Sequence, residues 1–255
     1  MNIVIVGSGN IATHLAKALY ASQHTITQVY SRTLANAQAL ANVLSSSAID
    51  NLAEIKKTAD LYLIAVSDSA IEDIISELPN ALQGIVVHTS GATDIKLLDI
   101  FFKYGVIYPP QSINKEIQTD ISSIPFGIEA NKPEIFDSLM ALMQPIAPKS
   151  FDCNSKQRLA LHLSAVLVNN FSNALFEMAH DILIQEGLDF ELLKPIILET
   201  ATKVQHTLPY ATQTGPACRG DHNTIDKHLQ FLSQSPEVSK IYQLLTDFII
   251  KRYHK

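Results

Sequence analysis

Residues 2–12 decide how the first half of this chain folds, and they read Asn2-Ile3-Val4-Ile5-Val6-Gly7-Ser8-Gly9-Asn10-Ile11-Ala12. The β-branched run predicts a strand at 3–6, and the apolar spacing after it predicts a helix at 11–21. Gly7 permits a tight turn, Gly9 lets backbone approach a pyrophosphate, and Ala12 lets helix and strand pack closely. This G-x-G-x-x-A pattern at a helix N-terminus predicts a dinucleotide site formed by Gly7, Ser8, Gly9, Asn10 and Ile11. The alternative is a glycine turn in an α/β fold that binds no cofactor.

Strand-like and helix-like stretches alternate over the first 150 residues. Further strands are expected at 26–30, 61–66, 85–89, 105–108, 125–129 and 148–152, with helices at 33–44, 70–77, 94–103 and 133–143. Nearly continuous apolar strands that alternate with helices are typical of a parallel sheet covered on both faces. We therefore predict an α/β fold class, with a Rossmann-type NADP-binding domain over residues 1–152.

The second half has a different character and predicts an all-α domain over residues 153–255. No strong helix breaker occurs from Ser155 to Glu186, and Gly187 follows as a C-cap, which predicts one helix of about 32 residues. Further helices are expected at 189–207, 224–233 and 236–252, with a loop at 212–219. The long helix is apolar on most sides, and the rest of the domain is too short to cover it. We therefore expect a homodimer through the C-terminal helices.

Composition excludes several classes of function. The 255 residues are 47% hydrophobic and 17% charged, with a net charge of −6 and no basic run, so nucleic acids and anionic membrane surfaces are not expected partners. The two cysteines are far apart and have no CxxC spacing, and neither a secretory signal pattern nor an 18-residue apolar run occurs. We expect a cytoplasmic protein with reduced thiols. The spacing of the histidines around residue 222 fits no standard metal site, so no metal is expected.

The end of the second strand indicates which dinucleotide is bound. NAD enzymes usually carry an acidic residue there to bind the ribose 2′-hydroxyl, whereas this chain carries Ser31-Arg32-Thr33. Arg32 can pair with a 2′-phosphate while Ser31 and Thr33 offer hydroxyl donors, so NADP(H) is the expected cofactor. The alternative is that Arg32 is an exposed surface residue.

Small polar residues follow two later strands and are expected to flank the ribose and nicotinamide, because ligands bind at the carboxyl ends of parallel strands. The residues expected to bind the cofactor at these two strand ends are Val66, Ser67, Asp68 and Ser90. Asp68 has the alternative role of capping the next helix. His88, inside the strand pattern, is expected to be a core histidine.

One face of the long predicted helix carries candidate catalytic residues. His162 is followed at spacings of 7, 8 and 11 residues by Asn169, Asn170 and Asn173, which share a face at 3.6 residues per turn. We predict that His162 and Asn170 are catalytic, with His162 as proton donor, and that Asn169 and Asn173 bind substrate. The alternative is that the amides pair with neighbouring backbone.

A second candidate cluster lies in the loop around residue 216, where glycines and a proline predict a rigid turn. Arg219 can clamp a substrate carboxylate, and Asp221 can bind substrate, pair with Arg219 or cap the following helix. The predicted substrate residues of this loop are Thr214, Gly215, Arg219 and Asp221.

Four motifs together resemble a known family. They are residues 7–12, residues 87–92 (Val-His-Thr-Ser-Gly-Ala), Leu161-His162-Leu163 with Asn169-Asn170-Phe171, and residues 214–221 (Thr-Gly-Pro-Ala-Cys-Arg-Gly-Asp). Over essentially its whole length the chain resembles bacterial proteins that join a Rossmann-like domain to a C-terminal domain of unknown function, often described as deazaflavin-dependent NADP oxidoreductase-like. The wider superfamily is similar to 6-phosphogluconate dehydrogenases, ketopantoate reductases and pyrroline-carboxylate reductases, which implies C-terminal domains that dimerise.

Two departures from this superfamily concern the candidate site. Ketopantoate reductases carry a catalytic lysine in a stripe of the form KxxxNxxxN, whereas the comparable positions here are His162, Val166 and Asn170. The resemblance thus implies that His162 replaces the lysine and that one asparagine is lost. The chain also has Tyr108-Pro109-Pro110-Gln111 where relatives carry a His-Pro-Leu-Gln type of sequence.

Three functions remain open from the sequence. The leading hypothesis is an NADPH-dependent reductase of a small 2-oxo acid or related carbonyl, with ketopantoate as one possibility. A non-catalytic NADP-binding redox sensor and a deazaflavin-dependent NADP oxidoreductase are the alternatives. They differ in whether a carbonyl substrate is turned over and in whether a tricyclic ring fits the pocket.

Overall fold

The computed structural model describes residues 1–112 and 119–254, and the chain divides into two compact units, Met1–Asn170 and Phe171–Lys255. Unit 1 contains the sheet, and unit 2 is helical. The predicted α/β fold class, a Rossmann-type domain followed by a helical region, is confirmed.

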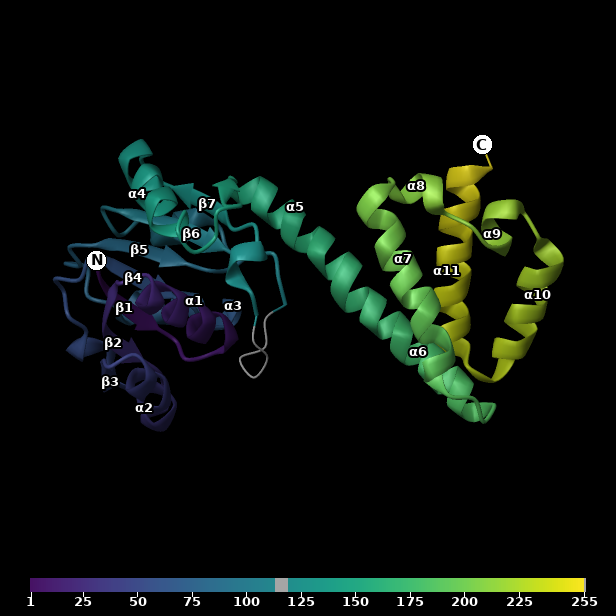
Figure 1. The fold of residues 1–255 in the computed structure, drawn as a ribbon, viewed down its shortest axis with the longest axis horizontal. Coiled ribbons are helices and arrows are strands. Elements are labelled where there is room, and N and C mark those ends of the chain that lie inside the picture. Colours follow the sequence, from purple (N-terminus) through teal and green to yellow (C-terminus); the bar gives the residue numbers. More distant parts are fainter. Residues whose placement is uncertain (113–118, 255) are drawn as a thin grey trace. The chain divides into compact units, whose positions relative to one another are not determined.

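Unit 1 is built on one eight-stranded sheet of order β3-β2-β1-β4-β5-β6-β7-β8 (Figure 1). The first six strands run parallel, β7 is antiparallel to β6, and β8 is parallel to β7. The chain crosses from the β3 edge to β4 on the other side of β1, and the loops beyond such a crossover diverge and leave a crevice at the carboxyl ends of the strands. The strands are β1 (Asn2–Val6), β2 (Thr25–Tyr30), β3 (Ser47–Ile49), β4 (Leu61–Ile64), β5 (Ile85–His88), β6 (Tyr104–Tyr108), β7 (Gly127–Ala130) and β8 (Phe151–Asp152).

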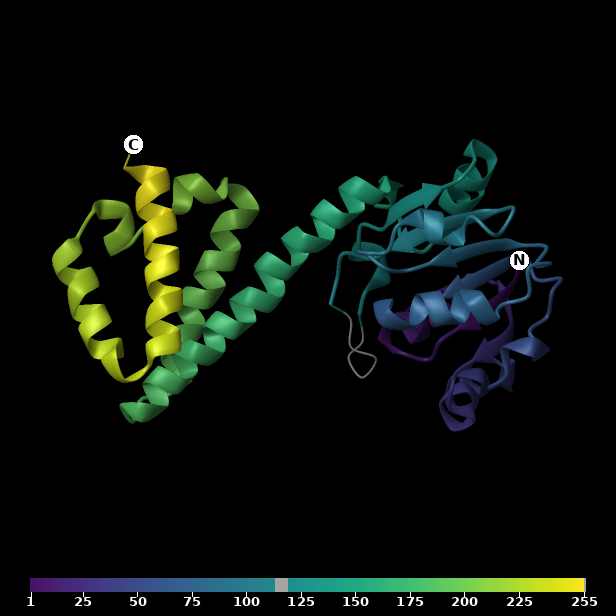
Figure 2. The same ribbon diagram turned by 180° about the vertical axis from the view of Figure 1, so that it is seen from behind.

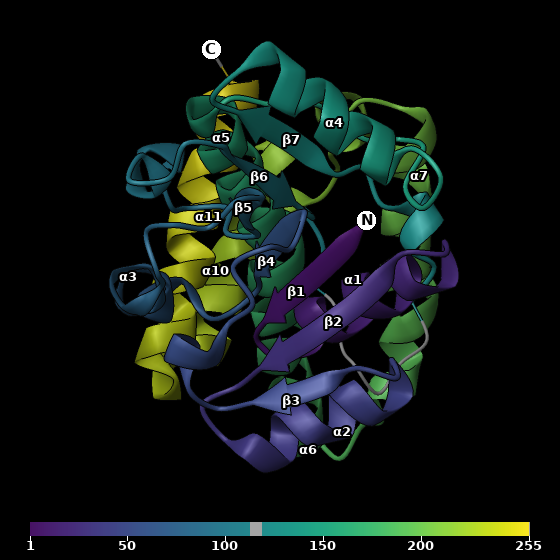
Figure 3. The ribbon, with the colours of Figure 1, turned by 90° about the vertical axis from the view of Figure 1, so that its left-hand side faces the viewer.

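Helices cover both faces of the sheet, which explains why its central strands are nearly continuous apolar runs. Helices α1 (Asn10–Ala21), α2 (Leu34–Val43) and α4 (Pro133–Met143) pack against one face. Helix α3 (Asp68–Glu77) packs against the other, with the turns that precede β4 and β6. Figure 3 shows α3 on one side of the strands and α1 and α4 on the opposite side.

Two elements of unit 1 differ from the sequence predictions. The strand β3 was not expected, because its three residues give no alternation that can be recognised. The helix expected at 94–103 is only a 3-10 turn at Ile95–Leu98, which Asp94 caps through the N–H of Lys96. The residues after this turn lead directly into β6.

The long helix predicted at 155–186 is present at Ser155–Gln185 (Figure 2). It consists of α5 (Ser155–Ala165), a π-helical segment at Val166–Phe171 and α6 (Ser172–Gln185). A capping box between Asn154 and Gln157 starts it, and Gly187 follows its end at a φ of +70°. By length and composition this helix is apolar enough to cross a membrane, with a mean hydropathy of 1.3 over its best 18-residue window.

The boundary between the units falls inside this helix, after Asn170. The sequence placed the domain boundary at residues 152 and 153, where strands give way to helices. The compact division comes later because the first turns of α5 are tied to the sheet by buried Arg158.

Unit 2 has almost no core of its own. After α6 it contains two 3-10 turns, at Phe190–Leu193 and Leu232–Gln234, and the helices α7 (Lys194–His206), α8 (Pro209–Thr212), α9 (Pro216–Arg219), α10 (His222–Phe231) and α11 (Pro236–Tyr253). The loop expected at 212–219 thus ends in a short helix. Among the described residues of this unit, the buried hydrophobic side chains are only Ala217, Ile225 and Leu232.

Candidate functional site

A cleft of about 500 Å³ opens at the carboxyl ends of β1, β2 and β4. It contains all five residues predicted to bind the dinucleotide, together with the predicted group that follows β2. Its lining is Gly7, Ser8, Gly9, Asn10, Ile11, Tyr30, Ser31, Arg32, Thr33, Asn36, Ala65, Val66, Ser67, Ala70 and Ile74. These residues come from three separate βα connections, which is the arrangement of a mononucleotide-binding crevice.

The glycine turn after β1 fits a pyrophosphate. Gly7 has a φ of +126°, and a Cβ there would lie 2.2 Å from the carbonyl oxygen of Ala65, so no other residue fits without moving β4. Gly9 has no heavy atom within 4 Å of its Cβ position, which leaves open space above the turn. In the described structure, α1 has no side-chain cap and no acidic residue in its first turn. Its N-terminus therefore presents positive dipole and backbone donors to an anion.

The subsite after β2 carries a positive charge and hydroxyls. The Ser8 and Ser31 hydroxyls are hydrogen bonded at 2.9 Å, and Arg32 and Thr33 are exposed at the cleft. No aspartate or glutamate is present among the described residues that line the cleft. The subsite therefore suits a phosphate better than a bare ribose hydroxyl pair.

A second pocket of about 340 Å³ adjoins the cleft, and the two share Ile11 and Val66 as lining residues. It lies within unit 1, where the loops after β4, β5 and β6 meet α5 and the π-helical segment. Its other lining residues are Asp68, Thr89, Ser90, Gly91, Tyr108, Pro109, Pro110, Gln111, Ser112, His162, Ala165, Val166, Val168, Asn169 and Asn170.

His162 and Tyr108 meet in this second pocket. The Tyr108 hydroxyl lies 3.1 Å from Nδ1 of His162, and the two rings pack edge to face at an angle of 77°. Burial, followed by the negative charge of Asp68, raises the pKa of Tyr108 to about 12. The tyrosine therefore remains a neutral phenol at physiological pH.

Ser90 presents a hydroxyl donor to the same pocket. Its Oγ accepts the N–H groups of Ala92 at 3.1 Å and Thr93 at 3.0 Å, so its own proton is available for a further acceptor. Its backbone N–H donates to Nδ1 of His88 at 3.2 Å. Burial, followed by the charge of Arg158, lowers the pKa of His88 to about 3. His88 is therefore a neutral core residue that supports the loop.

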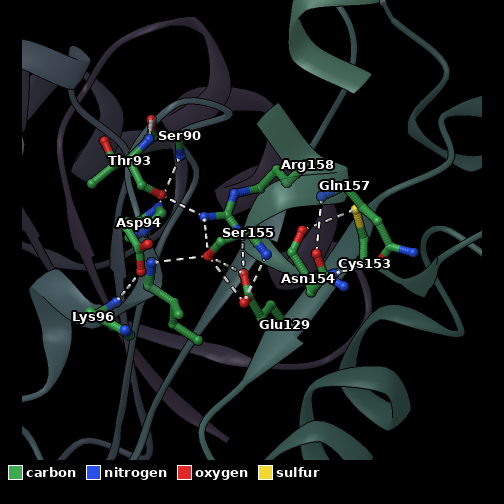
Figure 4. A network of polar contacts seen from close by, with 12 residues as sticks. Ser90, Thr93, Asp94, Lys96, Glu129, Cys153, Asn154, Ser155, Gln157 and Arg158 are labelled. Atoms are coloured by element: carbon green, nitrogen blue, oxygen red, sulfur yellow. Dashed lines mark hydrogen bonds and ion pairs between the residues drawn. The ribbon is translucent and has the colours of Figure 1, made fainter. Parts of the chain in front are cut away.

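A buried ion pair fixes the first turn of α5 beside this loop (Figure 4). The guanidinium of Arg158, which is 1% exposed, bonds the carboxylate of Glu129 on β7 and the carbonyl of Thr93. Ser155 also donates to both carboxylate oxygens of Glu129: its N–H lies 2.9 Å from Oε1, and its hydroxyl lies 2.9 Å from Oε2. His162 lies four residues after Arg158, one helical turn along α5, so the network also holds the histidine at the pocket.

The structure brings together most of the predicted residues of unit 1. Asp68 is the first residue of α3, and Ser67 is at the N-cap position, so the capping alternative for Asp68 is wrong. Asn169 and Asn170 line the pocket with His162, and both lie in the π-helical segment. Asn173 lies beyond the boundary, in unit 2.

The predicted loop residues all lie in unit 2. Gly215 has a φ of +104° and precedes α9, Thr214 comes just before it, and Arg219 is exposed. The Asp221 carboxylate accepts the N–H of Thr224 at 3.1 Å and its hydroxyl at 2.7 Å, and these bonds lower its pKa. Asp221 therefore caps α10, which is one of the alternatives the sequence left open.

The predicted site residues did not include Gly91 and Tyr108, which line the pocket, or Arg158, which lies beside it. The only signals were indirect. Tyr108 ends an apolar strand just before two prolines, and Arg158 is a charge at the start of a largely apolar helix. Neither pattern shows that these side chains meet.

Two family models match the chain. Residues 1–111 match the Rossmann-like domain, and residues 124–249 match DUF2520, a domain of unknown function. No curated protein matches.

Solved structures match almost the whole chain. A proposed NADP oxidoreductase from Bacteroides fragilis is 37% identical, with a TM-score of 0.87 and 98% of each chain covered. An imine reductase from Myxococcus stipitatus in complex with NADP+ is 17% identical, with a TM-score of 0.69 and 100% of each chain covered. A reductive aminase from Aspergillus terreus, in complex with NADPH and ethyl-5-oxohexanoate, is 14% identical, with a TM-score of 0.75, covering 98% of this chain and 94% of that one. At these lower identities the likeness concerns the fold.

Proposed function

This chain joins a Rossmann-like domain to DUF2520 and belongs to the family of the Bacteroides fragilis protein, and on that basis we propose that it is an NADP(H)-dependent reductase. Its substrate is a small 2-oxo acid, such as ketopantoate, or a related carbonyl compound. The observation that carries the proposal is the continuity of the two pockets. The cleft with the glycine turn and the pocket with His162 share Ile11 and Val66, so a reacting group bound at one end of the dinucleotide would face the histidine.

The residues of the cleft have separate tasks in this proposal. The backbone around Gly7 and Gly9 holds the pyrophosphate, and Arg32 with Ser31 and Thr33 holds the 2′-phosphate. In the adjoining second pocket, the Ser90 hydroxyl donates a hydrogen bond to the nicotinamide ribose or carboxamide.

The chemistry is divided between cofactor and protein. When bound as NADPH, the cofactor supplies a hydride, which is two electrons and a proton, to the carbonyl carbon. His162 supplies the second proton to the oxygen on which negative charge develops, and solvent restores the proton of the histidine. The carbonyl thus becomes an alcohol. Asn169 and Asn170 donate amide hydrogen bonds that orient the substrate.

The direct test is NADPH oxidation across a panel of 2-oxo acids, ketopantoate included, and of cyclic and acyclic imines. Turnover of one compound class supports the proposal, with NADH run in parallel for cofactor preference. Tight NADPH binding without turnover of any compound would instead favour the redox-sensor alternative. Reduction of a deazaflavin by NADPH, with no carbonyl turned over, would favour a deazaflavin-dependent NADP oxidoreductase.

A protonated imine is a second candidate substrate, and one observation favours it. Asp68 lines the second pocket, whereas no lysine or arginine is found among its described lining residues. A carboxylate there repels a 2-oxo acid and attracts a cation. In the reduction of a protonated imine, the substrate nitrogen already carries the proton that His162 supplies to the oxygen in the reduction of a carbonyl. The same panel separates the two candidates.

Replacing Arg32 with alanine is expected to raise the dissociation constant for NADP+ while leaving that for NAD+ unchanged. The substitution removes the guanidinium that forms a charge-assisted hydrogen bond to the 2′-phosphate. We expect this to weaken NADP+ binding by about 10- to 100-fold. Calorimetric titration of both dinucleotides measures it. Lys57→Ala, at an exposed cation outside the cleft, is the matched control. If Arg32→Ala weakened the binding of NADP+ and NAD+ equally, Arg32 would not bind the 2′-phosphate.

We also propose that a second copy of the chain covers the apolar helices. The exposed apolar residues include Leu163, Leu167 and Phe171 at successive turns of the long helix, which are 58%, 52% and 54% exposed. Unit 2 buries too few apolar side chains to be stable alone. Most soluble oligomers are homo-oligomers, and obligate interfaces resemble a domain core cut in half. This proposal makes the protein a soluble, cytoplasmic dimer and assigns no lipid to the helix.

Leu167→Glu is expected to convert this dimer to monomers. A glutamate at a buried interface position leaves an unpaired charge that costs about 3 kcal/mol, which is about 100-fold in the dimer dissociation constant. Sedimentation velocity at micromolar concentration measures the change. Val43→Glu, at an α2 residue that is 57% exposed, introduces the same charge and should leave the dimer intact. Wild-type protein that sediments as a monomer, or that partitions into lipid vesicles, would refute the proposal.

A further inference from the structure

The hydrogen bond between Tyr108 and His162 joins two elements far apart in the sequence, β6 and α5. We propose that Tyr108 is a positioning residue, whose hydroxyl oxygen accepts the Nδ1–H of His162 and holds the neutral imidazole in the tautomer with its proton on Nδ1, so that Nε2 is the nitrogen that gives up and regains the acid proton. This inference rests on the proposed function, because only a proton donor at His162 would need its imidazole held in one tautomer. The tautomer itself can be measured without a substrate.

The imidazole is confined on a second side by Gly91. A Cβ at this position would lie 2.7 Å from Cγ and 2.8 Å from Nδ1 of His162. Only glycine therefore allows the ring to lie against the loop after β5. With Tyr108 at Nδ1 and Gly91 under the same edge, the remaining polar atom of the ring is Nε2.

Tyr108 is well suited to fix another side chain, because its own place is fixed. It is the last residue of β6, is 5% exposed, and pairs with Gly127 of β7. Its hydroxyl is therefore positioned by the sheet and not by a loop. Groups that orient a reacting side chain are most effective when rigid elements carry them.

The burial and the charges around Tyr108 keep it a neutral phenol and exclude it as a proton relay. Burial and the carboxylate of Asp68 act against ionisation, as does Cys153, and Arg158 acts in the opposite direction. With a pKa of about 12, only about one phenol in 100,000 is ionised at pH 7. A relay would need the tyrosinate each time His162 took the phenol proton. Tyr108 therefore orients His162, and the proton is restored from solvent.

The decisive comparison is between wild type, Tyr108→Phe and the control Tyr104→Phe on the same strand. Ring-nitrogen NMR shifts of His162, in the neutral form, report which nitrogen carries the proton. We expect Nδ1 to carry the proton in wild type and in Tyr104→Phe, and a mixture of tautomers in Tyr108→Phe. With an active substrate, Tyr108→Phe should lower kcat about 10-fold, the loss of one hydrogen bond, and leave KM for NADPH unchanged.

Two results would overturn the proposal: a proton on Nε2 in the neutral ring of wild type, or ring-nitrogen shifts in Tyr108→Phe that equal those of wild type. Should Tyr108→Phe not fold, Gly91→Ala tests the same point, because its methyl group displaces the ring while Tyr108 remains. Gly91→Ala is expected to lose the fixed tautomer, and unchanged shifts would again refute the proposal. If wild type reduces no carbonyl or imine, the proposed function fails, and the ring-nitrogen shifts still decide this inference.

Discussion

Replacing His162 with alanine is expected to lower kcat by about 100- to 10,000-fold, the usual contribution of a positioned general acid. The affinity for NADPH should stay the same, because His162 lines the second pocket and not the glycine-turn cleft. Steady-state kinetics with the substrate found in the panel, together with calorimetric titration of NADPH, measure both quantities. A loss of kcat without a loss of cofactor affinity places the histidine at the reacting group.

Two further variants sharpen this test. His24→Ala changes a histidine that precedes β2, at the amino end of the sheet, and should leave kcat unchanged. His162→Lys keeps an ionisable acid at the position and should recover part of the lost rate. If His162→Ala turns over as fast as wild type, His162 is not the proton donor.

The second large effect concerns His88 and stability in acid. Burial lowers its pKa from an ordinary 6.5 to about 3, so in the folded protein the ring stays neutral, while in the unfolded chain it takes up a proton below pH 6.5. The unfolded state thus binds the extra proton between about pH 6.5 and 3, and stability falls as the pH falls through that window. On going from pH 7 to pH 5, His88 alone should cost about 2 kcal/mol of unfolding free energy.

Denaturant unfolding of wild type and His88→Asn at pH 7 and pH 5 measures this effect. Asparagine keeps an acceptor for the N–H of Ser90, the role of Nδ1 in wild type, but does not titrate. We expect wild type to lose about 2 kcal/mol more than His88→Asn over this range. His222→Asn, at an exposed residue, should behave like wild type. Equal losses in wild type and His88→Asn would show that another group controls the acid sensitivity.

Elements with strong local patterns could be predicted from the sequence. The apolar runs of β1, β4 and β5 stand out because both faces of the sheet are covered, and the long helix could be recognised because no breaker interrupts it. The glycine turn was predictable for a local reason too, since strand, turn and helix are consecutive. The 3-10 turn at Ile95–Leu98 was predicted as a longer helix because its composition is helical, whereas the chain must turn there into β6.

Contacts between distant segments could not be predicted in the same way. Tyr108 and His162 are 54 residues apart, and the close approach at Gly91 depends on how α5 packs on the loop after β5. The π-helical segment also has no recognisable signal, although both asparagines of the pocket lie in it. The candidate donor could thus be named from its residue type, but not the groups that hold it.

The near absence of a core in unit 2 has a consequence for how the chain matures. Unit 1 can collapse around its own sheet as a first-order process, at a rate that does not depend on concentration. If a second copy covers unit 2, its helices become protected only after two chains meet, which is a second-order process. At low abundance the waiting time for that encounter lengthens, and the apolar helices stay accessible to chaperones and proteases. The amount of chain made in the cell would then set how much of it survives.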